Sequence, residues 1–449
     1  ILVPVLLFPV FGCLFYIFVQ LQMETKILAK RIADIRIRTR SYLNQNEAIA
    51  AKLMKENRRN ANLSRYLSER AGYPVYDRTN FKYYPLGDDF FPDLLEELKA
   101  AERFIFLEYF IIQRGEMWDS VLKILEEKAA AGVDVRVLYD GMNSFSNLPH
   151  DYPKELEARG VRCRIFNPIR PAISTSQNNR DHRKILVIDG HTAFTGGVNL
   201  ADEYINRKVR FGHWKDNAVR LKGEAVKSFT VMFLQMWSVC AFRPEYDFDY
   251  GPFLDTGDHF HSPALNMDGY SIPFSDSPLD GEPVGHQVYL DIIYQARRYV
   301  YIMTPYLILD DDMVTALTYA AKRGVDTVIV MPHIPDKKYA FMLAHSYYPE
   351  LMEAGVKIYE YLPGFIHSKT FVSDDEKAVV GSINMDFRSQ YLNFECAVYI
   401  YKNPVVGDIR ADFDETLKKC VRMSMESYES LPMMHRFWGR TLRLIAPLM

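Results

Sequence analysis

One pattern of residue types occurs twice in this 449-residue chain, with the same spacing in both copies. In each copy a His is followed by a Lys two positions later and by an Asp five positions after that Lys, and a Gly-Gly or Gly-Ser pair and an Asn complete the pattern. The residues are His182, Lys184, Asp189, Gly196-Gly197 and Asn199 in the first copy, and His367, Lys369, Asp374, Gly381-Ser382 and Asn384 in the second. A single match arises by chance, but a second copy at identical spacing does not. The duplication predicts two similar halves that share one function.

The spacing places each His beside its Lys. The runs 185–188 and 370–373 that follow the lysines are apolar and β-branched, which predicts strands, and the glycine pairs predict the next turns. Side chains two positions apart on a strand point to the same face. An ammonium group neutralises the nonbridging oxygens of a phosphodiester, while a neighbouring imidazole attacks phosphorus or transfers a proton. Two such pairs that face each other predict a phosphate clamp.

A metal site is the other common use of histidine. Here each His neighbours a Lys, and no second His, Cys or carboxylate completes a set of metal ligands. We therefore predict chemistry without a metal or any other cofactor. A lone His in a strand is usually a structural residue, but the duplication argues against that interpretation for these two.

The chain from about Tyr76 onward resembles the phospholipase D superfamily in carrying these two His-Lys-Asp motifs. The resemblance implies an α/β fold in which two similar halves form a pseudo-dimer around one active site. It further implies that one histidine attacks the phosphodiester to give a phosphohistidine, while the other protonates the leaving alcohol and then deprotonates the incoming one. By position, His182 is the expected nucleophile and His367 the expected general acid and base, although near-symmetry leaves the exchanged roles open.

The same resemblance implies an acidic residue on the strand after each motif, which holds the second nitrogen of a histidine. The matching positions are Asp216 and Glu395, and the alternative is that they are ordinary strand-edge acids. Asp189 and Asp374 belong to the motifs and enter the candidate catalytic set with them. Their place at the far end of the motif strand nevertheless favours a role as structural anchors of the following turn.

Three further motif residues are candidates for binding phosphate. Asn199 and Asn384 carry amides, and Ser382 carries a hydroxyl, that can donate hydrogen bonds to phosphate oxygens. The first copy has Gly197 where members of the superfamily commonly have a serine. We therefore expect one half of the clamp to offer one side-chain donor fewer.

Strand and helix signals alternate in the same order in both halves. Apolar runs at 104–110 and 299–305 are each followed by a helical pattern that ends at a glycine, and then by a second apolar run. This alternation predicts two α/β halves, each with a mainly parallel sheet. The expected division is a transmembrane helix at 1–22, a basic juxtamembrane helical linker at 23–75, phospholipase D-like halves at 76–255 and 256–430, and an amphipathic tail at 431–449.

The N-terminal segment has the composition of a membrane anchor. The first 19 residues contain no charge, and a helix of residues 1–22 would be about 33 Å long, close to the thickness of bilayer hydrocarbon. The segment lacks the small-residue cleavage site that is expected at the end of a signal peptide. By the positive-inside rule, the basic residues that follow place the rest of the chain in the cytoplasm: Lys26, Lys30, Arg31, Arg36, Arg38 and Arg40. A reducing compartment also suits the five cysteines, which have no paired spacing: Cys13, Cys163, Cys240, Cys396 and Cys420.

Other segments are candidates for membrane contact or for covering the site. Residues 23–70 are charged and helix-prone, with irregularly spaced apolar residues, and we expect them to run along the bilayer surface. Residues 433–445 mix basic and large apolar side chains and predict a second interfacial helix, unless they simply pack against the core. The polar insertion at 168–179 precedes the first motif and is either a lid or a passive surface loop.

The order of membrane helix, short linker and two motif halves, without a regulatory domain, is similar to that of bacterial cardiolipin synthases. The resemblance implies transfer of a phosphatidyl group between two phosphatidylglycerol molecules, which forms cardiolipin and releases glycerol at the bacterial cell membrane. The alternative is a membrane-bound phospholipase D that hydrolyses lipid head groups. A nucleic-acid partner is disfavoured by the formal net charge of -3, and a binding scaffold is disfavoured by the intact motifs.

The sequence leaves two properties open. The oligomeric state is one of them, and a homo-oligomer is compatible with everything above. The chain begins with Ile rather than Met. Because proteins of similar architecture often carry two N-terminal membrane helices, we expect a further helix upstream of Ile1.

Overall fold

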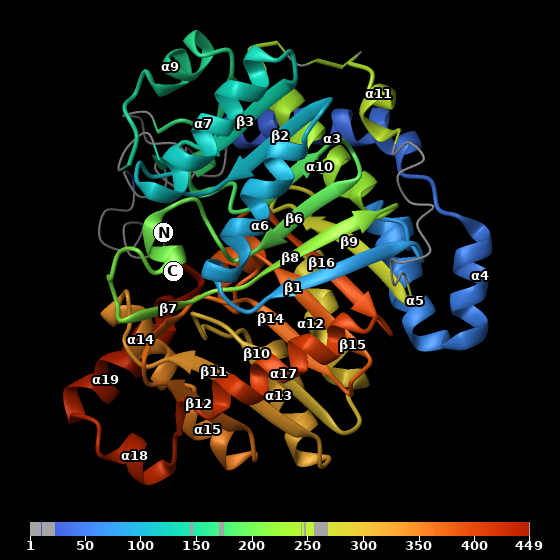
Figure 1. The fold of residues 1–449 in the computed structure, drawn as a ribbon. Helices are drawn as coiled ribbons and strands as arrows, with labels where there is room; N and C mark the ends of the chain where they lie inside the picture. The colour runs from blue at the N-terminus through green and yellow to red at the C-terminus, as the bar shows by residue number, and fades with distance from the viewer. Residues whose placement is uncertain are drawn as a thin grey trace.

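The protein consists of two sheet-and-helix halves that lie against each other (Figure 1). The computed structural model describes residues 23–143, 147–169, 175–243, 245–246, 248–255 and 268–448, together with Val10. The strands of the first sheet fall within residues 79–223 and those of the second within 270–422. The two halves of the chain therefore build one sheet each.

The first half begins after three N-terminal helices. These helices are α3 (Met23–Thr39), α4 (Glu47–Glu56) and α5 (Arg58–Tyr66). The strands of the first half are β1 (Thr79–Tyr84), β2 (Phe104–Tyr109), β3 (Asp134–Asp140), β4 (Arg162–Phe166), β5 (Lys184–Ile188), β6 (Thr192–Gly196), β7 (His213–Lys215) and β8 (Ala218–Gly223). Its helices are α6 (Gly87–Ala100), α7 (Glu116–Ala130), α9 (Tyr152–Ala158), α10 (Val226–Val239) and α11 (Gly251–Leu254).

The second half repeats this order and adds elements at its C-terminal end. Its strands are β9 (Tyr270–Asp276), β10 (Tyr299–Met303), β11 (Asp326–Pro332), β12 (Lys357–Tyr361), β13 (Gly364–Ile366), β14 (Thr370–Ser373), β15 (Lys377–Gly381), β16 (Glu395–Tyr401) and β17 (Cys420–Arg422). Its helices are α12 (Val284–Gln295), α13 (Asp311–Lys322), α14 (Lys338–His345), α15 (Tyr348–Glu353), α16 (Phe387–Tyr391), α17 (Val405–Leu417), α18 (Met425–Glu429) and α19 (Met433–Leu442).

The two sheets have the same topology. The first has the order β1-β8-β6-β5-β2-β3-β4, and the second has the matching order β9-β16-β15-β14-β10-β11-β12, with β17 added at its edge. Only β2-β3-β4 and β10-β11-β12 are parallel, and the remaining neighbours pair antiparallel. The prediction of a mainly parallel sheet is therefore wrong. Each motif strand turns back directly into the next strand, and such a short connection joins antiparallel neighbours.

The halves share a core because each contributes a helix to the other. Helix α10 is almost entirely buried; it packs on β2, β5, β6 and β8 of its own sheet and also on β9 of the second sheet. Helix α17 occupies the matching place after β16 and packs on β14 and β15 of its own sheet and on β1 of the first. Strand β6 also contacts β15 and β16. The motif strands β5 and β14, the neighbours of β6 and β15, thus lie close to the boundary between the halves, and Figure 1 shows β14 there.

The N-terminal helices pack into the protein. Ile32, Ile35, Leu53 and Leu63 are buried in the shared hydrophobic core, and α3 lies against α10. Ile27 remains 60% exposed. These four side chains therefore contact the protein core, and the prediction that the segment runs along a membrane surface stays a prediction for its exposed face. Their spacing is irregular because three short helices each bury a different face.

Several of the basic residues after the predicted membrane span have partners within the protein. Arg31 donates to the carbonyl of Val239 at 2.9 Å, and Arg36 donates to the carbonyl of Ala71 at 3.0 Å. Arg36 also pairs with Asp280. In the part of the chain that the structure describes, no helix is long and apolar enough to cross a bilayer. The predicted span at 1–22 lies outside the described residues except for Val10.

Two other predicted features are described only in part. Residues 170–174 of the insertion at 168–179 lie outside the described residues. On its C-terminal side, the carbonyl of Asn178 accepts a hydrogen bond of 3.4 Å from Arg388 of the second half. Cys163, Cys240, Cys396 and Cys420 are free thiols, whereas Cys13 lies outside the described residues.

Candidate active site

A cavity of about 350 Å³ opens at the boundary between the halves and is lined by both of them. Both motif histidines and both motif asparagines line it: His182, Asn199, His367 and Asn384. Its walls are largely aromatic, and the residues concerned are Phe110, Tyr204, Phe211, Trp214, Tyr306, Tyr339 and Phe365. The fold thus brings together two motifs that are far apart in the sequence.

The backbone of each half positions the histidine of the other. The amide of His182 donates to the carbonyl of Phe394 at 2.9 Å, and the amide of His367 donates to the carbonyl of Lys215 at 2.7 Å. Strands β13 and β7 form a short parallel pair that holds the second contact in register. An isolated bridge between Asp181 and Phe394 does the same for the first. Neither histidine can therefore be placed without the opposite half.

The carboxylates pair with the histidines crosswise. His182 Nδ1 lies 2.8 and 2.9 Å from the two carboxylate oxygens of Glu395, and His367 Nδ1 lies 2.6 Å from Asp216 Oδ2. Both acids are fully buried. Each histidine is thus oriented by the acid of the other half, an arrangement that the sequence alone did not indicate.

Burial favours the neutral form of both imidazoles. Burial, reinforced by the charges of Lys184 and Lys369, lowers the pKa of His182 well below its ordinary value. Burial and Lys369 lower the pKa of His367 to about 4. A neutral ring whose Nδ1–H donates to a carboxylate carries its lone pair on Nε2. Each ring is therefore prepared to act through Nε2 as a nucleophile or a base.

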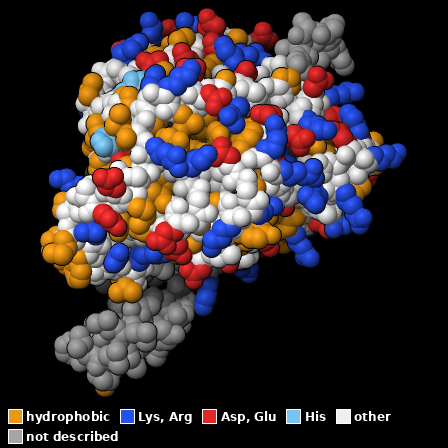
Figure 2. Space-filling view, turned by 90° about the horizontal axis from the view of Figure 1, so that it is seen from below, with side chains coloured by type: hydrophobic (Ala, Val, Ile, Leu, Met, Phe, Trp, Pro, Cys, Tyr) orange, Lys and Arg blue, Asp and Glu red, His pale blue; other side chains and the backbone are white. Residues whose placement is uncertain are grey.

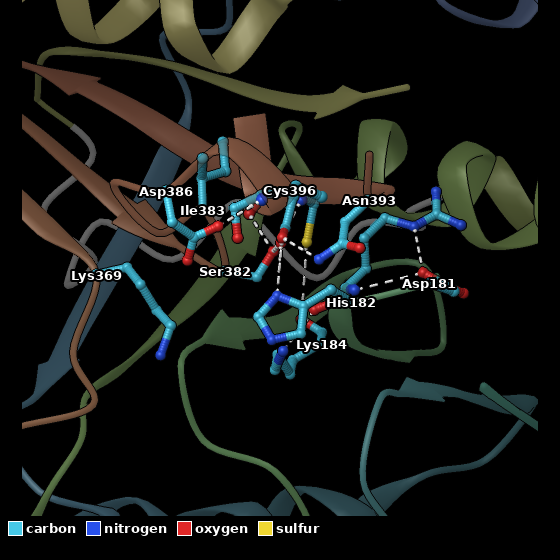
Figure 3. Close-up of polar contacts among 12 residues, drawn as sticks. Asp181, His182, Lys184, Lys369, Ser382, Ile383, Asp386, Asn393 and Cys396 are labelled. Carbon is cyan, nitrogen blue, oxygen red and sulfur yellow. Dashed lines mark hydrogen bonds and ion pairs between the residues drawn. The ribbon is translucent and has the colours of Figure 1, made fainter. Parts of the chain in front are cut away.

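The two motif lysines are folded back onto their own histidines, as the spacing predicts. Lys184 Nζ donates to the carbonyl of His182 at 2.5 Å, and Lys369 Nζ donates to the carbonyl of His367. Lys369 Nζ also lies 2.8 Å from His367 Nδ1, but we assign the Nδ1 proton to the closer carboxylate of Asp216. Figure 3 shows Lys184 beside the His182 ring, with Lys369 approaching from the other half.

Burial weakens the positive charge of both lysines. It lowers the pKa of Lys184 to about 8 and that of Lys369 to about 7. An anion in the cavity would favour the protonated lysines, because an opposite charge at close range raises the pKa of an ammonium group. The lysine pair is therefore suited to binding a phosphodiester.

Ser382 does not belong to the cavity lining. Its hydroxyl donates to the carboxylate of Glu395 and accepts a hydrogen bond of 3.0 Å from the amide of Cys396. The prediction that it binds phosphate is corrected to a role in holding Glu395. At the matching position, a Cβ on Gly197 would lie 2.0 Å from Asp216 Oδ1. The glycine thus leaves room for a carboxylate, and its lack of a hydroxyl removes no donor from the cavity.

The two motif asparagines differ in how many hydrogen bonds their side-chain amides make within the protein. Asn199 Oδ1 accepts from the amide of Ile111 at 3.0 Å, and its Nδ2 donates to the Tyr204 hydroxyl at 2.7 Å. One amide hydrogen of Asn199 remains for a ligand. Asn384 is 5% exposed, and its Oδ1 has no hydrogen-bond partner within the described chain. Asn384 is thus the less constrained of the two.

The motif aspartates lie away from the cavity. Asp189 accepts hydrogen bonds of 2.7 to 2.8 Å from the amides of residues 102–104, and Asp374 accepts three of 2.8 to 3.0 Å from those of residues 297–299. Both have positive φ angles, 54° and 57°. These contacts tie the end of each motif strand to the start of β2 or β10. Their inclusion in the catalytic set is corrected to the anchor role.

Aromatic residues around the histidines were not among the predicted site residues. Phe110 meets the His182 ring edge-on at 4.9 Å between centroids, and Tyr204 meets the His367 ring in the same way at 5.4 Å. Trp214 lies 5.5 Å from the His367 ring. Phe110 ends the first aromatic run, and Trp214 lies two residues before Asp216. These positions close to predicted site elements are the sequence feature that could have identified both residues as part of the site. These rings make the cavity partly apolar.

The described part of the chain contains no cluster of side chains suited to bind a metal ion, either in this cavity or elsewhere. Within those residues, no three or more His, Cys, Asp or Glu side chains are arranged to hold a metal ion. The prediction of cofactor-free chemistry stays a prediction.

We expect kcat/KM to depend on pH with a bell shape centred between about 7 and 8. Burial raises the pKa of Glu395 to about 7, so the acceptor for the His182 Nδ1 proton becomes ionised as pH rises through that value. Above it Lys369, with a pKa of about 7, and Lys184, with a pKa of about 8, lose the charge that binds phosphate. Initial rates across this range measure the profile.

The variant Lys369→Arg tests the falling limb of this profile, since Lys369 has the lower of the two lysine pKa values and a guanidinium stays charged. We expect that limb to shift to higher pH, with the rising limb unchanged. Asp216 is the internal comparison: despite burial, its interactions with His367 and Lys369 hold its pKa below the ordinary value, so Asp216 adds no limb to the profile near neutral pH. A flat profile would contradict the assignment.

Fold and site define a protein of the phospholipase D type, with two motif halves around one histidine pair. The family model described as cardiolipin synthase, PLD-like domain, matches residues 94–237 and 289–417. The chain belongs to this cardiolipin synthase family.

The relatives agree with this membership. A cardiolipin synthase of Alkalihalophilus pseudofirmus is 34% identical over 98% of this chain and 87% of its own length. An uncharacterized protein of Streptococcus mutans is 50% identical over 100% of this chain and 95% of its own length. The crystal structure of phosphatidylserine synthase from Haemophilus influenzae superposes with a TM-score of 0.65 at 14% identity, covering 88% of this chain and 100% of the other. That likeness concerns the fold.

Proposed function

We propose that this enzyme transfers a phosphatidyl group from one phosphatidylglycerol to the terminal hydroxyl of another through a phosphohistidine, forming cardiolipin and free glycerol. Membership of the cardiolipin synthase family supports the reaction. The observation that carries the mechanism is the crosswise pairing of two buried neutral histidines with two buried acids at one cavity. Two equivalent imidazoles suit a reaction in two displacement steps.

In the first step, Nε2 of His182 attacks the phosphorus of the donor lipid, and the bond from phosphorus to the glycerol oxygen breaks. The anionic phosphate of the bound donor raises the pKa of His367, so that His367 takes up a proton as the donor binds and gives it to the departing oxygen. In the second step, neutral His367 takes the proton of the incoming hydroxyl, whose oxygen attacks phosphorus and breaks the phosphorus–nitrogen bond. Lys184 and Lys369 stabilise the charge on the nonbridging oxygens in both steps.

The difference between the two acids supports this division of roles. Asp216 stays ionised near neutral pH, because its pKa is held below the ordinary value. A histidine that carries a proton between the two steps is best stabilised beside a permanent negative charge, and His367 has that partner. Glu395, with a pKa raised to about 7, provides a weaker counter-charge for His182.

A membrane site for the reaction is part of the proposal. We propose that residues 1–22 anchor the chain, on the basis of their uncharged composition and the basic residues that follow. Helix α19 supplies a second contact. It packs against α14 on one side and exposes large apolar side chains on the other, namely Met433, Met434, Phe437 and Trp438. Seen from below, apolar patches alternate with Lys and Arg side chains (Figure 2), a mixture typical of interfacial surfaces.

The test is to incubate detergent-purified protein with phosphatidylglycerol and to identify the products by mass spectrometry. We expect cardiolipin and free glycerol in equal amounts. The matched control is protein with both His182→Asn and His367→Asn, which should form neither. Phosphatidic acid as the main product would replace the proposal with hydrolysis, and no conversion of phosphatidylglycerol would overturn it.

A further inference from the structure

Two cations in the lining of the cavity have no role in the mechanism above. Lys337 and Arg388 line the same cavity as His182 and His367. Lys337 precedes α14, and Arg388 lies on α16. Both belong to the second half, whereas the third cation of the lining, Arg210, comes from the first.

The three cations differ in how far they are neutralised. Arg210 pairs with the carboxylate of Glu203 at 3.0 Å. In the described part of the chain, neither Lys337 nor Arg388 makes an ion pair. Lys337 lies over the Tyr306 ring at 5.1 Å, and the one hydrogen bond that Arg388 donates to a described residue is that of 3.4 Å to a backbone carbonyl.

The two acids of the lining are bound to other groups. Asp336 accepts a hydrogen bond of 2.5 Å from the Tyr306 hydroxyl. Asp386 caps the start of α16 by accepting from the amide of Ser389 at 2.7 Å. The charges of Lys337 and Arg388 both act on Asp386, but no described acid forms an ion pair with either cation, so both can bind an anion in the cavity.

The proposed reaction requires an anion at such a place. Water, released glycerol and the acceptor lipid all offer a hydroxyl to the phosphohistidine, and water and glycerol are both uncharged. The acceptor alone carries a phosphate, which a glycerol bridge separates from the hydroxyl that reacts. A cationic site beyond the histidines would hold the acceptor in place and raise its local concentration over water.

We propose that Lys337 and Arg388 bind the phosphate of the acceptor lipid while its terminal hydroxyl reaches the phosphohistidine. This inference rests on the proposed function and names the acceptor part of that site. The histidines, together with Lys184 and Lys369, bind the donor phosphate. The two phosphates of the product therefore occupy two separate cationic sites. In the transfer step the hydroxyl proton passes to His367, the oxygen–phosphorus bond forms, and the bond to His182 breaks.

The test compares two reactions that share the phosphohistidine. In the first, phosphatidylglycerol alone is converted to cardiolipin. In the second, deuterated glycerol added to phosphatidylglycerol is incorporated into the lipid, which uses the donor site but no acceptor phosphate. Initial rates of both are measured by mass spectrometry for the wild-type protein, for Lys337→Gln, for Arg388→Gln and for the double variant.

We expect the double variant to lose about 10- to 100-fold in cardiolipin formation, as for a lost pair of charge-assisted hydrogen bonds, and to lose far less in glycerol exchange. Lys337→Arg should restore most of the loss at that position. The matched control is Lys338→Gln, because Lys338 is exposed and does not line the cavity.

The outcomes separate this inference from the function on which it rests. An equal loss in both reactions would assign the cations to the donor or to the fold, and no loss in either would remove them from the site. Both results would overturn the inference while leaving cardiolipin synthesis intact. If the wild-type protein exchanges glycerol but forms no cardiolipin, the proposed function itself fails.

Discussion

Replacing His182 with Asn is expected to abolish the covalent phosphatidyl-enzyme, whereas replacing His367 with Asn is expected to preserve it when the leaving group needs no proton. With phosphatidylglycerol, both variants should lose on the order of 10⁴-fold in turnover, because each histidine is needed in both steps. A phosphatidyl ester of p-nitrophenol separates them, since p-nitrophenolate leaves without an acid.

The measurement is the burst of p-nitrophenolate together with the intact mass of the protein. We expect His367→Asn to release about one equivalent rapidly and to gain the mass of one phosphatidyl group, because resolution of the intermediate lacks its base. We expect His182→Asn to show neither. The matched control is His150→Asn, an exposed histidine away from the cavity, which should behave as wild type. A burst that survives in His182→Asn but not in His367→Asn would show that the roles are exchanged.

The second large effect is expected from Glu395→Gln. Because Glu395 orients His182, this substitution should impair the histidine of the opposite half. An amide in place of the carboxylate presents an N–H group to His182 Nδ1, which favours the tautomer with the proton on Nε2 and removes the attacking lone pair. We expect the p-nitrophenolate burst to slow by on the order of 10³- to 10⁴-fold.

Asp216→Asn is the matched comparison, since Asp216 orients His367. With the p-nitrophenyl ester, its burst should remain near that of wild type, while its steady-state turnover falls. If the burst is lost in Asp216→Asn and kept in Glu395→Gln, either the crosswise pairing or the division of roles is wrong. Circular dichroism and thermal unfolding of both variants exclude loss of the fold as the cause.

The sequence predicted the strand-and-helix order of the two halves but not the direction of all their strands. The alternation up to β4 and β12 gave the parallel strands correctly, because helical crossovers join them. The motif strands and those that follow are linked by short turns, and the same apolar patterns there mark antiparallel neighbours. Apolar runs indicate buried strands without indicating their direction.

The N-terminal helices show that the sequence is equally limited in predicting which partner an apolar surface contacts. Basic residues among apolar ones predict a membrane-facing segment, yet Ile35 and Leu53 are each only 2% exposed. A pattern of apolar and basic residues does not tell whether the apolar face meets a bilayer or another helix. Contacts such as that of Arg31 with the carbonyl of Val239 join residues 208 positions apart, beyond the reach of any local pattern.

By itself the sequence determined which groups make up the centre of the site, because the two-residue spacing of His182 and Lys184, and of His367 and Lys369, is a local property of the chain. The tertiary structure alone decided which acid serves which histidine. Glu395 lies 213 residues from His182, and Asp216 lies 151 residues from His367. The physical reason is the packing of the two halves, which places the histidine at the start of each motif against the segment that carries the acid of the other half.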